Sequence, residues 1–251
     1  MNFRTSNPLA NIPVFTKNLL IVTVISFLAQ KGLPALGFDY TNFFALHYWK
    51  STEFYPHQLV THIFIHSMND FSHLLFNMFG LYMFGRVLET TMGEKRFLMF
   101  YLITGVGAAI VQLISREVQA QMLIPDLSNE AIEYARMNGA EIIRTSMGSA
   151  KYLNDPSFVK YLILTNSTMV GASGAIFGIL MAFGYLFPNA QLQLLFPPIP
   201  IKGKYIAILA LVMGIFTDLQ GNVAHFAHFG GMLTGFILLK IWNTKGNSFR
   251  L

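Results

Sequence analysis

The sequence predicts an all-α, polytopic membrane protein with six membrane-spanning helices. Hydrophobic residues make up 53% of its 251 residues and charged residues only 12%, whereas an average soluble domain has about 25% charged residues. The charges are also clustered, because eleven of the 17 basic and 12 acidic residues lie within 116–160. The remaining charges are too few to cover a water-exposed surface. The composition therefore excludes an ordinary soluble enzyme and a disordered chain, and the lack of cysteine excludes disulfides and cysteine-bound metals.

Six apolar segments approach the length that crosses a bilayer, about 20 residues. We expect membrane helices at 18–36, 71–88, 97–114, 170–187, 205–217 and 224–242. The first could instead be a signal peptide, because Lys17 precedes a short apolar run, but no Ala-x-Ala cleavage pattern follows it. The fourth stops at Pro188, which cannot continue a helix. The sequence thus predicts a membrane domain at 18–243 between short tails at 1–17 and 244–251.

The distribution of Lys and Arg predicts the orientation in the membrane. With the N-terminus inside, ten basic residues fall on inner segments, and only Lys31 and Lys50 fall on short outer ones. The ten are Arg4, Lys17, Arg86, Lys95, Arg96, Lys202, Lys204, Lys240, Lys245 and Arg250. Because short cytoplasmic loops carry the excess of positive charge, we expect both termini to be cytoplasmic. The net charge of +5 then reflects topology rather than nucleic-acid binding, and we expect a multi-pass protein of the bacterial inner membrane.

Two outer segments differ from simple connections. The loop at 31–60 is rich in aromatic residues, which favour the headgroup layer, so we expect it to fold against the outer interface. The segment at 116–168 looks like a soluble-type insertion. In it, Ser128 is a candidate cap for a helix at 129–144, with Ile132, Ala135 and Ile143 on its buried face.

Polar residues inside the predicted spans require an explanation, because they are costly in lipid. His73 and Asn77 lie one turn apart on the second span, Ser173 lies at the start of the fourth, and His225 and His228 lie at the start of the sixth. The predicted orientation runs all three spans from outside to inside. At 1.5 Å per residue these side chains share a depth of roughly 5–10 Å below the outer surface.

Glycine spacing suggests how these polar groups meet. Gly174 and Gly178 form a G-x-x-x-G pattern on the fourth span, and Gly231 and Gly235 form another on the sixth. Such patterns let helix backbones approach closely, which would bring Ser173 near His228. Each pattern alone is more often simple packing, and a lone intramembrane Ser usually bonds its own helix. The acids near the spans are Asp70 and Glu89 at the edges of the second and Asp218 at the end of the fifth, so a Ser-His-Asp triad has no obvious acid member.

Taken together, the motifs resemble the rhomboid family of intramembrane serine proteases, whose six-span arrangement they match. They are His73-x-x-x-Asn77, Gly171-x-Ser173-Gly174 and Ala227-His228-x-x-Gly231-x-x-x-Gly235.

The resemblance implies a Ser-His dyad without an acid and without a cofactor or metal. It assigns Ser173 as nucleophile and His228, rather than His225, as general base. It also implies an oxyanion site made by the Ser173 N–H with the His73 and Asn77 side chains. The supporting positions are Phe177, which would pack on the catalytic imidazole, and the glycines Gly171, Gly174, Gly231 and Gly235.

The expected substrates are single-span membrane proteins, cut near the outer boundary of the lipid bilayer. One departure from the family is that His57-Gln58 occupies the place of a Trp-Arg pair that many bacterial rhomboids carry. Two alternatives remain open. One is a non-catalytic rhomboid-like scaffold that binds membrane clients, and the other is a haem or metal protein using His62, His66, His225 and His228.

Overall fold

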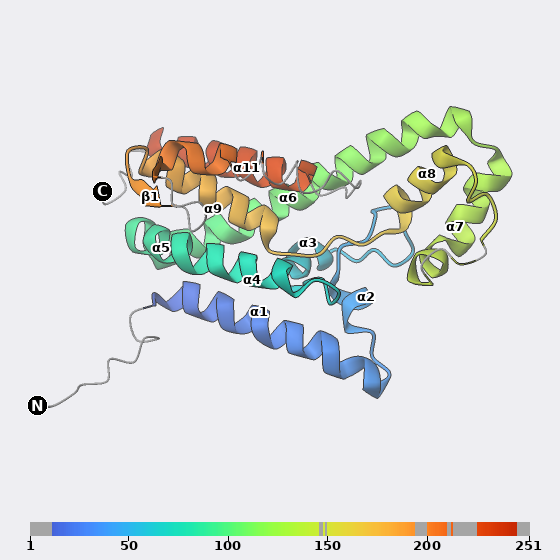
Figure 1. Cartoon of the computed structure of the whole chain (residues 1–251), viewed down its shortest axis with the longest axis horizontal. Coiled ribbons are helices and arrows are strands. Elements are labelled where there is room, and N and C mark those ends of the chain that lie inside the picture. Colours follow the sequence, from blue (N-terminus) through green and yellow to red (C-terminus); the bar gives the residue numbers. More distant parts are fainter. Residues whose placement is uncertain are drawn as a thin grey trace, which may run out of the picture.

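The computed structural model describes residues 12–145, 148, 150–193, 200–209, 212 and 225–244, which are mostly helical (Figure 1). The helices are α1 (Val14–Gly32), α2 (Tyr40–Phe44), α3 (Gln58–Thr61), α4 (Phe71–Gly80), α5 (Arg86–Met92), α6 (Glu94–Leu123), α7 (Asn129–Arg144), α8 (Pro156–Asn166), α9 (Ser173–Leu186) and α11 (His225–Thr244). The strands β1 (Gln191–Gln193) and β2 (Pro200–Lys202) form an antiparallel pair.

The helix boundaries differ from the predicted spans in three places. A π-helical turn at Leu81–Gly85 joins α4 to α5, so the second span is one helical run that ends at Met92. The third continues to Leu123, well past the predicted end at 114. The fourth begins at Ser173 itself, because residues 170–172 are not helical. Residues 210, 211 and 213–217 of the predicted fifth span, and Asp218 directly after it, lie outside the described residues.

Length and apolar composition support two of the six predicted crossings. Within the described ranges, Val14–Leu36 and Glu94–Asp126 are long and apolar enough to span a membrane, and Ser173–Leu186 is a shorter apolar helix. The count of six spans therefore stays a prediction.

The faces of α1 are inverted relative to a helix of a soluble protein. Its buried positions are mostly polar and include Thr23, Ser26 and Gln30, whereas Ile25 and Leu28 are about 60% exposed. Water on such an apolar face would be unfavourable, but lipid is not. This pattern is the arrangement expected of a helix whose outer surface faces hydrocarbon.

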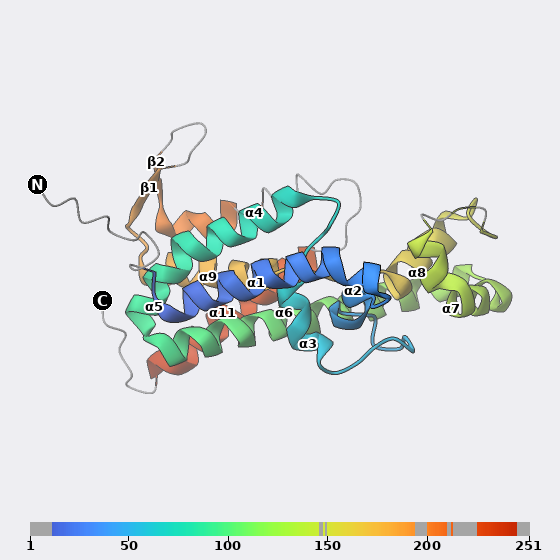
Figure 2. The ribbon, with the colours of Figure 1, turned by 90° about the horizontal axis from the view of Figure 1, so that it is seen from below.

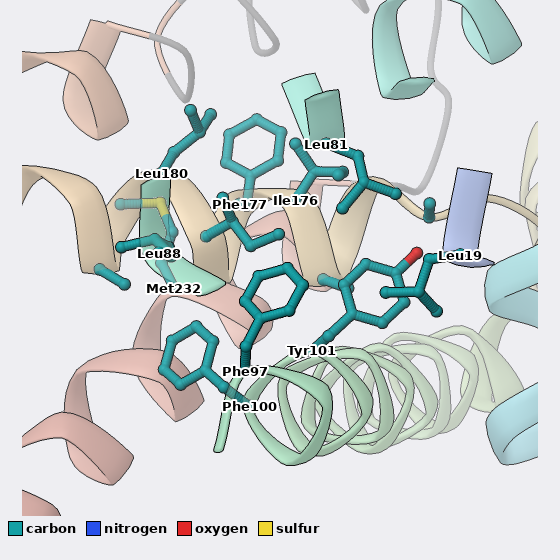
Figure 3. Close-up of a cluster of buried hydrophobic side chains, with 14 of the residues drawn as sticks. Leu19, Leu81, Leu88, Phe97, Phe100, Tyr101, Ile176, Phe177, Leu180 and Met232 are labelled. Atoms are coloured by element: carbon teal, nitrogen blue, oxygen red, sulfur yellow. The ribbon is translucent and has the colours of Figure 1, made fainter. Parts of the chain in front are cut away.

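The main hydrophobic core lies where α6, α9 and α11 pack against one another. Figure 3 shows this cluster, in which Phe97 and Tyr101 of α6 point toward α9 and Phe100 points toward α11. Small residues permit the close packing, since a Cβ built on Gly178 would lie 2.7 Å from the Cβ of Thr104. The helices of this core therefore pack closely because small residues let their backbones approach, and not only because large apolar side chains fill the space between them.

The predicted insertion folds as a helical pair, α7 and α8, beyond the end of α9 that carries Ser173 (Figures 1 and 2). The Ser128 hydroxyl accepts a hydrogen bond from Ala131 N at 3.1 Å and caps α7, as predicted. The buried face was predicted only in part. Ala135 is buried, but Ile132 and Ile143 are only half-buried. The residues directly before them in the sequence, Ala131 and Ile142, are buried instead. The buried residues of α7 are Ala131, Ala135, Gly139 and Ile142.

Candidate active site

Ser173 is the first residue of α9, at the end of an extended segment. Side chains cap four other helices, because Asp39, Asp70, Ser128 and Asp155 accept hydrogen bonds from the first turns of α2, α4, α7 and α8. The cap residue of α9 is Ala172, which has no side chain able to do this. The positive end of α9 therefore presents uncapped amides beside the Ser173 hydroxyl.

The side chains of Ser173 and His228 meet across the interface between α9 and α11. The Ser173 Oγ and the His228 Nε2 lie 2.9 Å apart, which is hydrogen-bond distance. The ring of Phe177, one turn below Ser173, stacks on the imidazole with 4.1 Å between centroids and 12° between planes. The packing of Phe177 on His228 that the family resemblance implied is thus present.

Two glycine contacts bring α9 and α11 this close. A Cβ built on Gly231 would lie 1.9 Å from the carbonyl oxygen of Gly174, closer than any real contact. A Cβ on Gly235 would lie 3.2 Å from the Cα of Gly178. The two G-x-x-x-G patterns therefore face one another, as the sequence predicted, and His228 lies one turn before this crossing.

The second imidazole of the site, His73, lies over Gly171. Gly171 has φ of +118°, and a Cβ there would lie 2.8 Å from the His73 Cε1 and 2.9 Å from its Nε2. This explains why glycine is needed two residues before Ser173. Asn77 is buried, and its Nδ2 donates to the His73 carbonyl oxygen at 2.7 Å. One of the two Nδ2 protons is therefore held by the helix, and no partner for the other lies among the described residues.

In the described part of the chain, no carboxylate is hydrogen-bonded to the Ser173 hydroxyl or to the His228 ring. The Nδ1 of His228 is buried and has no hydrogen-bond partner there. His225, one turn before it on α11, is half-buried. The described geometry is thus a Ser-His pair.

Loop histidines that sequence analysis considered as metal ligands instead hold the segment before Ser173. Gly171 N donates to the His62 carbonyl oxygen at 3.0 Å, and Ala172 N donates to the His66 Nε2 at 3.4 Å. Burial, followed by the nearby His73, lowers the pKa of His66 to about 4, so its ring is neutral and can accept this bond. In the described ranges no three His, Asp or Glu side chains are grouped to hold a metal ion.

Gln30 is a structural residue that the sequence analysis missed. It is buried on α1, where its Nε2 donates to the His66 carbonyl oxygen at 2.9 Å and its Oε1 accepts from His66 N at 3.0 Å. A polar residue inside an apolar span is the signal that could have identified it.

The unusual His57-Gln58 pair organises the outer loop. The His57 ring lies 4.8 Å from the ring of Phe43 and 5.8 Å from that of Tyr55. Gln58 is fully buried, and its amide donates to the Glu53 carbonyl oxygen at 2.9 Å. The two side chains thus stabilise the loop through contacts within it.

Comparison with known proteins identifies the fold of this site. The model of the Rhomboid domain matches residues 53–124 and 155–243, and leaves out the segment that contains α7. The chain is 27% identical to RHOMBOID-like protein 12, mitochondrial, of Arabidopsis thaliana over 184 residues, and 27% identical to Rhomboid protein 1, mitochondrial, of Saccharomyces cerevisiae over 172. It is 22% identical to Rhomboid protease GlpG of Haemophilus influenzae over 234 residues.

The extent of these matches differs. They cover 70%, 67% and 92% of this chain, in the same order. The aligned region is 43% and 37% of the two mitochondrial relatives but 92% of the bacterial one. An integral membrane location follows from the shared domain. With mitochondrial and bacterial relatives both present, the comparisons do not favour the bacterial inner membrane that the sequence analysis expected.

Proposed function

The chain belongs to the rhomboid family, and from this premise we propose that it is an intramembrane serine endopeptidase. The observation that carries the proposal is the 2.9 Å contact between the Ser173 Oγ and the His228 Nε2. A hydroxyl so placed can lose its proton to the imidazole as it attacks a carbonyl carbon.

The reaction runs in two halves. In the first, Ser173 Oγ bonds to the scissile carbonyl carbon while His228 Nε2 takes its proton, and the same proton then goes to the leaving amine as the C–N bond breaks. In the second, His228 takes a proton from water, the resulting hydroxide adds to the acyl ester, and the Ser173 Oγ leaves with that proton. The protein ends unchanged and the peptide bond is hydrolysed.

We expect three groups to stabilise the tetrahedral oxyanion. The Ser173 N–H lies at the uncapped, positive end of α9, where a negative charge is favoured. His73 lies over Gly171, and Asn77 lies one turn further along the same helix. Stacking on Phe177 holds the His228 ring in one orientation, which limits the motion needed during proton transfer.

The proposed substrates are single-span membrane proteins, which reach the site laterally from the lipid bilayer. The proposed topology has both termini in the cytoplasm and the site near the outer surface, so water enters from outside. Hydrolysis needs this water because hydrocarbon holds little of it.

The test is cleavage of a model single-span substrate by purified protein, together with labelling by a fluorophosphonate that reacts with activated serines. Wild type is expected to cleave and to be labelled, and Ser173→Ala and His228→Ala are expected to do neither. His225→Ala serves as the matched imidazole control and should retain labelling. Labelling that survives Ser173→Ala would place the nucleophile elsewhere, and client binding without any cleavage by wild type would favour the scaffold alternative.

A further inference from the structure

The outer end of α6 continues beyond the part needed to cross the membrane. Its 30 residues correspond to about 45 Å at 1.5 Å per residue, compared with about 30 Å for a hydrocarbon core. Two successive residues of this extension, Arg116 and Glu117, point to two different neighbouring segments.

Arg116 is held in an environment that is costly for a cation. Its side chain is 3% exposed, and its Nε has no hydrogen-bond partner in the described part of the chain. Its Nη1 donates to the carbonyl oxygen of Ser167 at 2.7 Å. Burying a guanidinium without a carboxylate partner is unfavourable. We therefore interpret Arg116 as a residue that holds the main chain of Ser167 in place.

Ser167 begins the extended segment that leads to the nucleophile. It follows the last residue of α8 and has an extended backbone, with ψ of 146°. Two residues on, Met169 pairs with Leu46 through N–H···O bonds of 2.8 and 2.9 Å in both directions. The segment 167–172 is thus held by Arg116 at Ser167 and by the outer loop at Met169. It leads directly into Ser173.

Glu117 holds the other side of the same pairing. Its carboxylate accepts hydrogen bonds from the Tyr48 hydroxyl, from Trp49 Nε1 at 2.7 Å and from Lys50 Nζ at 2.6 Å. These three residues follow Leu46 closely in the outer loop. Two adjacent residues of α6 therefore bind both segments that meet at the Leu46–Met169 pair, namely the outer loop and the segment before Ser173.

We propose that Arg116 and Glu117 are positioning residues that hold the segment 167–172, and with it Ser173, in register with His228. This inference rests on the proposed function for its consequence in catalysis, but its structural content stands apart from activity. Displacing a reacting group by about 1 Å can cost on the order of 100-fold in rate. Loosening the segment should therefore affect the reaction more than substrate binding.

The experiment compares Arg116→Met with Arg116→Lys, which retains one donor for the Ser167 carbonyl. Arg136→Met is the matched control, because Arg136 lies on α7 and pairs only with exposed Glu133 among the contacts described. Amide hydrogen exchange of residues 169–172 is measured alongside the rate of fluorophosphonate labelling of Ser173 and the kcat and KM of cleavage.

Arg116→Met is expected to raise amide exchange in 169–172 and to lower the labelling rate and kcat about ten- to a hundredfold, with KM changed less than about twofold. Arg116→Lys should recover much of the loss, and Arg136→Met should match wild type. Unchanged exchange in 169–172, or equal losses in Arg116→Met and Arg136→Met, would overturn the proposal.

Failure of the proposed protease function, or of the Arg116→Met variant to fold, can be distinguished from failure of the positioning role. If wild type is neither labelled nor active, the proposed protease function fails, but hydrogen exchange still decides whether Arg116 holds the segment. If Arg116→Met does not fold, Glu117→Gln gives the test from the opposite side. Raised exchange at Leu46 and Met169 in that variant supports the positioning role, and unchanged exchange contradicts it.

Discussion

Gly231 faces the carbonyl oxygen of Gly174 so closely that a Cβ on Gly231 would lie 1.9 Å from that oxygen. The neighbouring atom is backbone, which cannot rotate away as a flexible side chain can. Any side chain at Gly231 must therefore move α11 away from α9, and the Ser173–His228 contact depends on that helix spacing.

Gly231→Ala is accordingly expected to abolish cleavage and to lower the unfolding temperature of the detergent-solubilised protein. The natural control is Gly32→Ala at the end of α1, where a Cβ meets nothing within 4 Å. Cleavage and thermal unfolding are measured for both variants. Wild-type activity in Gly231→Ala would mean that the helices are further apart than described.

Phe177→Leu removes the ring stacked on His228 but leaves an apolar side chain of similar bulk. An aromatic contact of this kind is worth about 1 kcal/mol, equivalent to about a fivefold change in rate if it orients the imidazole. We expect kcat to fall by about that factor with KM nearly unchanged. Phe229→Leu, at a half-exposed position next to His228, controls for loss of an aromatic residue. A kcat equal to wild type would remove Phe177 from the orientation of the base.

Glu89 fixes the start of α1 to α5. It is 2% exposed, and its carboxylate accepts hydrogen bonds from Phe15 N at 2.8 Å and from Thr16 N and Oγ1, both at 2.7 Å. Glu89→Gln keeps the shape but removes the charge that strengthens these bonds. We expect a loss of about 2 kcal/mol in the free energy of unfolding.

The measurement for Glu89→Gln is denaturant unfolding in mixed micelles, with Glu133→Gln as the exposed-carboxylate control. If both variants lose the same small amount of stability, the contact between Glu89 and α1 contributes little.

The contact between the insertion and the outer loop is expected to weaken in acid. Arg144 Nη2 lies 2.5 Å from Glu53 Oε1, to which Asn42 Nδ2 also donates, and His47 Nδ1 lies 3.6 Å from Glu53 Oε2. Burial alone would raise the pKa of Glu53, but the hydrogen bonds from Asn42 and Arg144 and the charge of Arg144 outweigh it and lower the pKa. The ionised Glu53 carboxylate therefore stabilises the contact above pH 4.5, the ordinary pKa of this group. This stabilisation is lost as the pH falls through the lower pKa that Glu53 has in the folded protein.

Spin labels can follow this contact because the chain has no cysteine. Labels at Met137→Cys on α7 and Val60→Cys on α3, both exposed positions, should show a distance distribution that broadens as the pH falls below the ordinary carboxyl pKa of 4.5. Glu53→Gln should broaden it at neutral pH and make it independent of pH. A distribution that stays narrow in both cases would mean that other contacts hold the insertion.

Local sequence signals predicted the elements whose determinants are local. Ser128 begins a helix because its hydroxyl and the following residues suffice to cap one, and the glycine patterns on the fourth and sixth spans predicted the approach of Ser173 to His228. The end of the third span was misplaced because a charged residue, Arg116, usually ends a buried apolar run. Its partner is a carbonyl 51 positions along the chain, and no pattern near Arg116 announces that contact.

The site was predictable to a similar degree. Residue types and spacing singled out Ser173, His73 and Asn77 as candidates, and the family resemblance chose His228 over His225. Neither gave the reason for Gly171, which depends on the ring of His73 occupying the space of a Cβ. Gln30 was also missed, since its role depends on the main chain of His66, a residue 36 positions away. Neither Arg116 nor Gln30 has a nearby pattern that identifies its distant main-chain partner, whereas paired glycine patterns on two spans do predict that the two helices approach.

The uncapped start of α9 bears on the choice of inhibitors. If Ser173 is the nucleophile that we propose, a boronic acid bonded to it would become a tetrahedral anion, and the uncapped amides at this helix end would stabilise that charge. A planar, uncharged ligand of equal size gains nothing from them. Compounds that acquire negative charge only after bonding to the hydroxyl would therefore suit this site and also cross the surrounding lipid in their neutral form.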